Sequence, residues 1–196
     1  MFRRVSWIVA FILALSTLSA GPASASSAGA GTYKYHVGDT LLQDLGFPMG
    51  DQATASVNGD VVTVVATGTF DTATRSATDT GANMFWHRSS GGTLIASGTF
   101  TTTGMQSFQF YGCGVLDGNP VPASWCGGRV QLTGVATAHP AGHPEITFTL
   151  PIVLTIECVI GNPVAGATEG IRVNVQDLIN FNKTVAESGA NVFIRQ

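Results

Sequence analysis

Residues 146–160, ITFTLPIVLTIECVI, carry the clearest structural signal in the chain. Every even-numbered position from Ile146 to Ile160 is apolar, whereas the odd positions include threonines, Pro151 and Glu157. Side chains of a β-strand point alternately to its two faces, so this pattern predicts a strand whose even face is buried. Pro151 has no N–H group to donate to a neighbouring strand, which indicates a sheet edge or a bulge at that position.

The same alternation recurs along the chain and predicts an all-β fold. Apolar residues alternate from Val130 to Ala138 and from Ile171 to Val175, and a last strand is expected from Ala190 to Arg195. No window longer than about ten residues follows a helical period. We therefore expect about eight to ten strands in one domain. Long strands with glycine in mid-strand favour a single antiparallel β-barrel, and a two-sheet β-sandwich is the alternative.

Two hairpins are predicted in the first half of the domain. In the first, residues 54–57 and 60–70 are joined by Asn58-Gly59, a pair that accepts the positive φ angles of a type I′ turn. In the second, residues 82–88 turn through Ser-Ser-Gly-Gly into residues 93–103. The two return strands are similar, because VVATGTF at 64–70 matches LIASGTF at 94–100 position for position. This similarity predicts a repeated structural unit.

The N-terminus has the pattern of a secretory signal peptide. Two arginines precede an apolar run from Val5 to Leu15, and residues 23–25 (Ala-Ser-Ala) are the small residues that signal peptidase requires. We expect residues 1–25 to be the signal peptide, 26–32 a flexible leader and 33–196 the folded domain. The apolar run is shorter than the roughly 20 residues that span a membrane. The chain is thus expected to be secreted, with no transmembrane segment after cleavage; an uncleaved N-terminal anchor is the alternative.

The charge of the chain argues against one class of partner. The sequence holds 9 Lys and Arg against 12 Asp and Glu, for a net charge of −3, and cleavage after Ala25 would also remove Arg3 and Arg4. The remaining cationic residues stand singly, whereas proteins that bind nucleic acid usually cluster them. No nucleic-acid partner is expected.

Three cysteines in an exported chain allow one disulfide. Cys113 ends the predicted strand 106–111 and Cys126 begins the next strand, so a bridge between them would close the turn-rich loop that separates them. Cys158 lies on the apolar even face, where an unpaired thiol packs as a small hydrophobic group. We predict a Cys113–Cys126 disulfide and a free Cys158. A catalytic Cys158, the alternative, would need an exposed thiolate beside a base.

Four polar residues are candidates for chemistry. His139, His143 and Glu145 are close in sequence and are all potential metal ligands, but two prolines and a glycine among them indicate a solvated hairpin turn. His87 shares a predicted strand face with Phe85, as either an acid–base group or a partly buried structural histidine. The usual local motifs of hydrolases, proteases, kinases and dehydrogenases are missing, and neither a metal nor a cofactor is expected.

Three classes of function remain open from the sequence. A secreted binding module for a small apolar or sugar-like ligand fits a barrel or curved sandwich, which often holds a ligand at its mouth or concave face. Trp125 and Leu116, on the loop closed by the predicted disulfide, are the expected ligand contacts; packing of Trp125 over the disulfide is the alternative. An exported hydrolase or isomerase whose acid and base meet in space and a structural or surface-associated protein are the other classes. The absence of catalytic motifs favours a non-enzyme.

Overall fold

A computed structural model describes residues 29–196 of the chain. The predicted signal peptide, residues 1–25, and the first part of the predicted leader lie outside the described residues. Residues 29–31 of that leader lie against the domain: Gly29 contacts the side chain of Phe110, and its carbonyl oxygen accepts a hydrogen bond of 3.0 Å from the hydroxyl of Tyr33. Within residues 29–196, no helix is long and apolar enough to cross a membrane.

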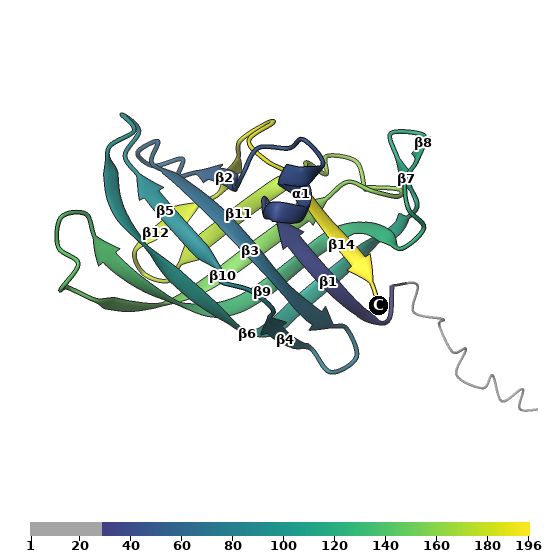
Figure 1. Ribbon diagram of the computed structural model, residues 1–196, viewed down its shortest axis with the longest axis horizontal. Coiled ribbons are helices and arrows are strands. Elements are labelled where there is room, and N and C mark those ends of the chain that lie inside the picture. The colour runs from purple at the N-terminus through teal and green to yellow at the C-terminus, as the bar shows by residue number, and fades with distance from the viewer. Residues whose placement is uncertain (1–28) are drawn as a thin grey trace, which may run out of the picture.

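The described residues form fourteen strands and one short helix, which confirms the predicted all-β fold class (Figure 1). In chain order the elements are β1 (Thr32–Val37), α1 (Thr40–Asp44), β2 (Asp51–Thr54), β3 (Val61–Asp71), β4 (Ser76–Asp79), β5 (Met84–Arg88), β6 (Leu94–Cys113), β7 (Val115–Leu116), β8 (Asn119–Pro120), β9 (Trp125–Pro140), β10 (Phe148–Cys158), β11 (Gly170–Val175), β12 (Ile179–Phe181), β13 (Lys183–Thr184) and β14 (Asn191–Arg195). The count exceeds the expected eight to ten because several strands have only two or three residues.

Twelve strands belong to one strongly curved antiparallel sheet, and β7 and β8 form a separate small hairpin. The sheet runs in the order β12-β11-β10-β9-β14-β1-β3-β2-β13, while β5 and β6 connect β3 back to β9. Its strands face each other across a common interior (Figure 1).

The predicted closed barrel is not formed. Strand β9 pairs with β10 from Gly128 to Ala138, but with β14 only at Trp125 and Cys126, so the sheet divides along β9. β12 and β13, the first and last strands of the hydrogen-bonded order, do not pair with each other. These two strands are consecutive segments separated only by Asn182, which leaves no chain for the turn that an antiparallel pair needs.

Both predicted hairpins are present. The first differs from the prediction, because β2 ends at Thr54 and residues 55–60 form the turn to β3, whereas a strand over 54–57 and a two-residue turn were expected. The second pairs β5 with β6 as expected. The matching segments 64–70 and 94–100 lie in β3 and β6, on either side of β5. Gly98 in the second copy marks a close approach of two strands, because a Cβ atom there would overlap the carbonyl oxygen of Thr137 on β9.

Strand β10 confirms the alternation on which the fold prediction rests, with one addition. Ile152, Leu154 and Ile156 on the even face are buried, but so is Glu157 on the opposite face. The Glu157 carboxylate accepts hydrogen bonds from Tyr111 at 2.8 Å, from Arg129 at 2.7 Å and from Arg172 at 3.2 Å. These four residues lie on the neighbouring strands β6, β9, β10 and β11, and their long side chains cover the outer face of the sheet. Burial alone would raise the pKa of Glu157, but its hydrogen bonds from Arg129 and Tyr111 lower it below its ordinary value.

The interior is densely packed at one end. Tyr33, Phe70, Phe108 and Phe193 form an aromatic cluster in which Phe70 lies 5.2 Å from Tyr33, 5.0 Å from Phe108 and 5.5 Å from Phe193, measured between ring centroids. Such contacts are typical of stacked and edge-to-face rings in protein cores. Phe70 is near the end of β3, whereas Val62 and Val64 at its beginning line the cavity described below.

The predicted disulfide joins Cys113 and Cys126, with an S–S distance of 2.03 Å. The two cysteines are paired residues at the end of β6 and the start of β9, so the bridge closes the loop that carries β7 and β8. Cys158 is free and buried, as expected. Burial raises the pKa of the Cys158 thiol well above its ordinary value, which favours the unreactive protonated form.

Candidate functional site: an apolar cavity

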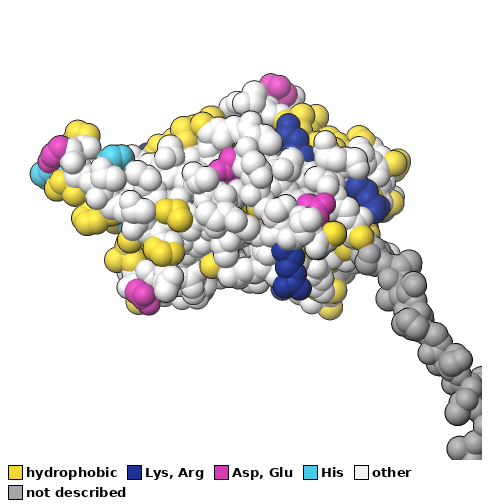
Figure 2. Space-filling model, turned by 90° about the horizontal axis from the view of Figure 1, so that it is seen from below, with side chains coloured by type: hydrophobic (Ala, Val, Ile, Leu, Met, Phe, Trp, Pro, Cys, Tyr) yellow, Lys and Arg dark blue, Asp and Glu magenta, His cyan; other side chains and the backbone are white. Residues whose placement is uncertain are grey.

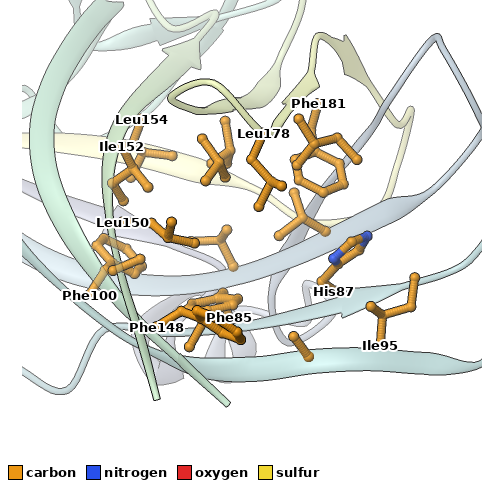
Figure 3. A pocket seen from close by; sticks show the side chains of 18 of the residues that line it. Phe85, His87, Ile95, Phe100, Phe148, Leu150, Ile152, Leu154, Leu178 and Phe181 are labelled. Carbon is orange, nitrogen blue, oxygen red and sulfur yellow. The ribbon is translucent and has the colours of Figure 1, made fainter. Parts of the chain in front are cut away.

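The end of the interior away from the aromatic cluster encloses a cavity of about 460 Å³ (Figure 3). Strands β3, β5 and β6 contribute Val62, Val64, Phe85, His87, Ala96 and Phe100. Strands β9, β10 and β11 contribute Ala136, Ala138, Leu150, Ile152, Leu154 and Val173. The remaining lining residues, close to its rim and to β12, are Ile95, Pro140, Phe148, Val175, Leu178, Ile179 and Phe181.

Strand alternation explains why these residues face the cavity. Phe85 and His87 are two apart on β5 and therefore lie on the same face, whereas Trp86 between them points the other way. His87 is paired with Val62 on β3 and with Ala96 on β6, so the three residues form a row across neighbouring strands. The small Ala96, together with Ala136 and Ala138 on β9, leaves space that larger side chains would occupy.

All lining residues but His87 are apolar. Its imidazole Nε2 lies 2.9 Å from Oδ2 of Asp60, the residue that precedes β3. The side chains of His87 and Asp60 are 19% and 12% exposed, so their hydrogen bond is largely shielded from water. The ring of Phe181 also meets the imidazole edge-to-face at 5.1 Å between centroids. His87 is thus held in a fixed orientation by a carboxylate and an aromatic ring.

Large apolar side chains surround the opening of the cavity. Leu178, in the turn between β11 and β12, is 69% exposed, Phe148 at the start of β10 is 52% exposed, and Ile95 is 39% exposed. Figure 2 shows apolar side chains spread over the face in view, with few and scattered charged side chains between them. Exposed aromatic and branched side chains around a concave opening are typical of sites that meet an apolar partner.

His139 lies at the end of β9, and His143 and Glu145 lie in the exposed turn that leads to β10. Nδ1 of His143 is 3.2 Å from the Glu145 carboxylate, and both side chains are more than half exposed. Nδ1 of His139 lies 3.0 Å from the carbonyl oxygen of Ile146. This is the solvated turn expected from the prolines. In the part of the chain that the structure describes, no group of three His, Cys, Asp or Glu side chains is arranged to hold a metal ion.

Trp125 and Leu116, the ligand contacts expected from the sequence, do not line the cavity. Both are partly buried and pack against the hydrophobic core near the disulfide. Trp125 is paired with Ile194 on β14, and its backbone N–H donates to the carbonyl of Pro122. This position matches the packing alternative for Trp125. The sequence reasoning identified His87 and its shared face with Phe85, but missed Asp60, because 27 residues separate Asp60 from His87.

A second buried polar cluster lies away from the cavity. Asp51 Oδ2 accepts a 2.8 Å hydrogen bond from Asn191 Nδ2, and Asp51 Oδ1 accepts one of 2.7 Å from Ser188. The two carboxylate oxygens of Glu169 accept backbone N–H bonds from Val159 at 2.9 Å and from Asn191 at 2.8 Å. Burial raises the pKa of Glu169 to about 8, even though these hydrogen bonds act to lower it. Burial likewise raises the pKa of Asp51. These contacts join β2, β14 and the segment before β11.

Comparison with known proteins adds no family to this description, since no family model, curated protein or solved structure matches the chain. The class defined by the fold and the site is an all-β, disulfide-bonded protein with an apolar internal cavity.

Proposed function

We propose that this protein binds a small apolar molecule in the cavity between β3, β5, β6 and β9–β11. The observation that carries the proposal is the combination of a volume of about 460 Å³ with a lining that is apolar everywhere except at His87. Small-molecule sites commonly measure about 300–1,000 Å³ and combine an apolar wall with few polar groups.

The lining favours an apolar ligand over a sugar-like one. A sugar presents many hydroxyl groups, and each would lose its hydrogen bonds to water on entering a wall that offers a single polar side chain. The same lining favours binding over catalysis as an exported hydrolase or isomerase. Catalysis of either kind needs a base and a second polar group that stabilises the charge formed in the reaction. Of the lining residues, His87 is the one that could supply either role.

We also propose that the chain is secreted after cleavage behind Ala25. The Cys113–Cys126 disulfide supports this proposal, because structural disulfides persist mainly in oxidising compartments. The intact mass of the protein recovered from the culture medium tests it. We expect an N-terminus at Ser26 and a mass two hydrogens below that of the reduced chain; a full-length mass in the cell fraction would contradict secretion.

Ligand binding can be tested with N-phenylnaphthylamine, an uncharged dye whose emission rises and shifts to the blue in apolar surroundings. We expect saturable binding at one site per chain. The variant Ala96→Phe places a ring in the cavity and should weaken dye binding at least about tenfold, because the added ring takes the volume that the dye needs.

The matched control is Ala123→Phe, which adds the same ring in the exposed loop before β9. It should bind the dye as the unsubstituted protein does. Thermal unfolding of both variants verifies that they are folded. Dye binding that does not saturate, or that Ala96→Phe and Ala123→Phe affect equally, would refute the proposed function.

A further inference from the structure

We infer that the ligand is an apolar alcohol, a molecule with one hydroxyl group that meets Nδ1 of His87. This inference rests on the proposed function and adds the chemical class of the ligand. It starts from the two nitrogen atoms of the imidazole, which have different partners. Nε2 is engaged by Asp60 at 2.9 Å, whereas within residues 29–196 Nδ1 forms no hydrogen bond. His87 lines the cavity, and its ring lies among the apolar side chains of the wall (Figure 3).

The Asp60 carboxylate fixes the hydrogen-bonding role of each nitrogen. An ionised carboxylate can only accept hydrogen bonds, so Nε2 must carry a proton and donate it to Asp60. In the neutral ring Nδ1 is therefore an acceptor, and in the protonated ring it is a donor. A hydroxyl group fits both states because it can donate as well as accept. An ether oxygen or a ketone oxygen fits only the protonated ring.

The same carboxylate disfavours an anionic ligand. A carboxylic acid that entered as its anion would share a single imidazole with Asp60, and two negative charges would then lie around one cation at most in a largely dehydrated site. No Lys or Arg lines the cavity to balance the second charge. A neutral hydroxyl group gains the hydrogen bond without that cost.

The surroundings also set where the rest of the ligand lies. The imidazole contacts both Asp60 and the ring of Phe181, and the rest of the wall, including Phe85 and Leu150, is apolar. In such a ligand a single hydroxyl group would contact His87, the one polar lining residue, and the hydrocarbon part would contact the apolar lining residues. The exposed Leu178 and Phe148 at the rim can extend the contact with the hydrocarbon part.

The test compares ligands that share one hydrocarbon chain and differ at one end. Lauryl alcohol, its methyl ether and lauric acid are each titrated against bound N-phenylnaphthylamine at neutral pH, and the dissociation constants are obtained from displacement of the dye. We expect the alcohol to bind about tenfold more tightly than the ether, because a tenfold difference in affinity corresponds to the free energy of about one buried hydrogen bond. The alcohol should also bind more tightly than the acid. An ether that matches the alcohol, or an acid that exceeds it, overturns the inference.

A substitution assigns the preference to His87. In His87→Phe, the alcohol should lose its advantage over the ether; the dissociation constant of the dye is measured separately for each variant, so that the comparison of alcohol and ether does not depend on it. Because this change leaves the Asp60 carboxylate without its partner, the double variant His87→Phe with Asp60→Asn is measured beside it. An alcohol preference that survives in the folded variants would contradict the role of His87.

The two levels of the proposal fail differently. If neither the dye nor any member of the series binds, the proposed function is wrong, and the inference about the alcohol falls with it. If the dye binds saturably but the alcohol and the ether are equivalent, the cavity binds apolar molecules and only the role of the hydroxyl group is refuted.

Discussion

The buried carboxyl of Glu169 leads to a sharp prediction about pH and stability. Its two oxygen atoms accept backbone N–H bonds from Val159 and Asn191, and its surroundings exclude water well enough to raise its pKa from the ordinary value of 4.5 to about 8. Between these values the folded protein holds a proton on Glu169 that the unfolded chain releases. Stability from this group is therefore fully present below about pH 4.5 and is lost as the pH rises through about 8.

The size of the effect follows from the width of this window. Each pH unit between the unfolded and the folded pKa changes the free energy of unfolding by about 1.4 kcal/mol. Over the whole window, Glu169 should reduce the stability of the protein by about 5 kcal/mol. That is a large part of the roughly 5–15 kcal/mol by which a domain is usually stable. The buried Asp51, whose pKa is also raised, acts in the same direction.

The variant Glu169→Gln removes the titrating group. Free energies of unfolding are measured by urea denaturation at several values from about pH 5 to about pH 9 for the unsubstituted protein and the variant. The variant loses one backbone hydrogen bond, because its amide nitrogen cannot accept, and should be less stable at the acid end by about 1–3 kcal/mol. The difference between the two proteins should then shrink or reverse as the pH rises, since only the unsubstituted protein loses the Glu169 contribution.

The difference curve is the decisive quantity, because contributions from titrating groups that do not interact with Glu169 cancel in it. Glu187 has an exposed side chain, and Glu187→Gln is the matched control, for which we expect a flat difference curve. A flat curve for Glu169→Gln as well, or a difference that grows with pH, would refute the assignment of Glu169 as a buried carboxyl that is protonated in the fold.

Three further predictions concern the disulfide, the free thiol and one surface turn. Replacing Cys113 and Cys126 together by serine should lower the free energy of unfolding by about 3 kcal/mol, the loop entropy of a bridge with a sequence separation of 13, as measured by urea denaturation; an unchanged midpoint would contradict it. In unreduced protein, a thiol reagent should label Cys158 after unfolding but not in the folded state. Label found by peptide mapping on Cys113 or Cys126 would show a different pairing. The backbone N–H of Thr74, with the hydroxyls of Thr32 and Thr74, lowers the pKa of Asp71 to about 2, so its contribution to stability is present above about pH 4 and is lost as the pH falls towards 2. Asp71→Asn should make unfolding less dependent on pH in that acid range, and an unchanged acid limb would count against this turn.

Local sequence pattern predicts the strands well, because burial of one strand face is a local property. The even face of residues 146–160 is buried over most of its length, and the second hairpin pairs as expected, whereas the first strand of the first hairpin lies three residues before the predicted one. The same pattern fails at Phe148, which continues the apolar face but is half exposed at the rim of the cavity. Periodicity shows which side of a strand is apolar; it does not show whether core atoms or an empty space lie opposite.

The candidate site depends on contacts between distant segments, which one sequence does not reveal. His87 was singled out, but its partner Asp60 follows an Asn-Gly turn and looks like an ordinary turn residue until β3 and β5 are brought into register. Whether the strands form a closed barrel likewise depends on how segments that are distant in the sequence pair. β12 and β13 are strands of only three and two residues, separated by Asn182 alone. Strands this short give no clear alternation of apolar residues, so the sequence does not reveal where they begin and end.

The two ends of β9 have different surroundings. Cys126 near its start is joined to β6 by the disulfide, whereas Ala136 and Ala138 near its end line the cavity, about 33–40 Å further along an extended strand. Side chains at this far end can therefore be enlarged or reduced without touching the bridge or the aromatic cluster. A panel of substitutions at Ala96, Ala136 and Ala138 would yield proteins with graded internal volumes and a shared framework. Such a panel could be selected to carry apolar molecules of different sizes through water.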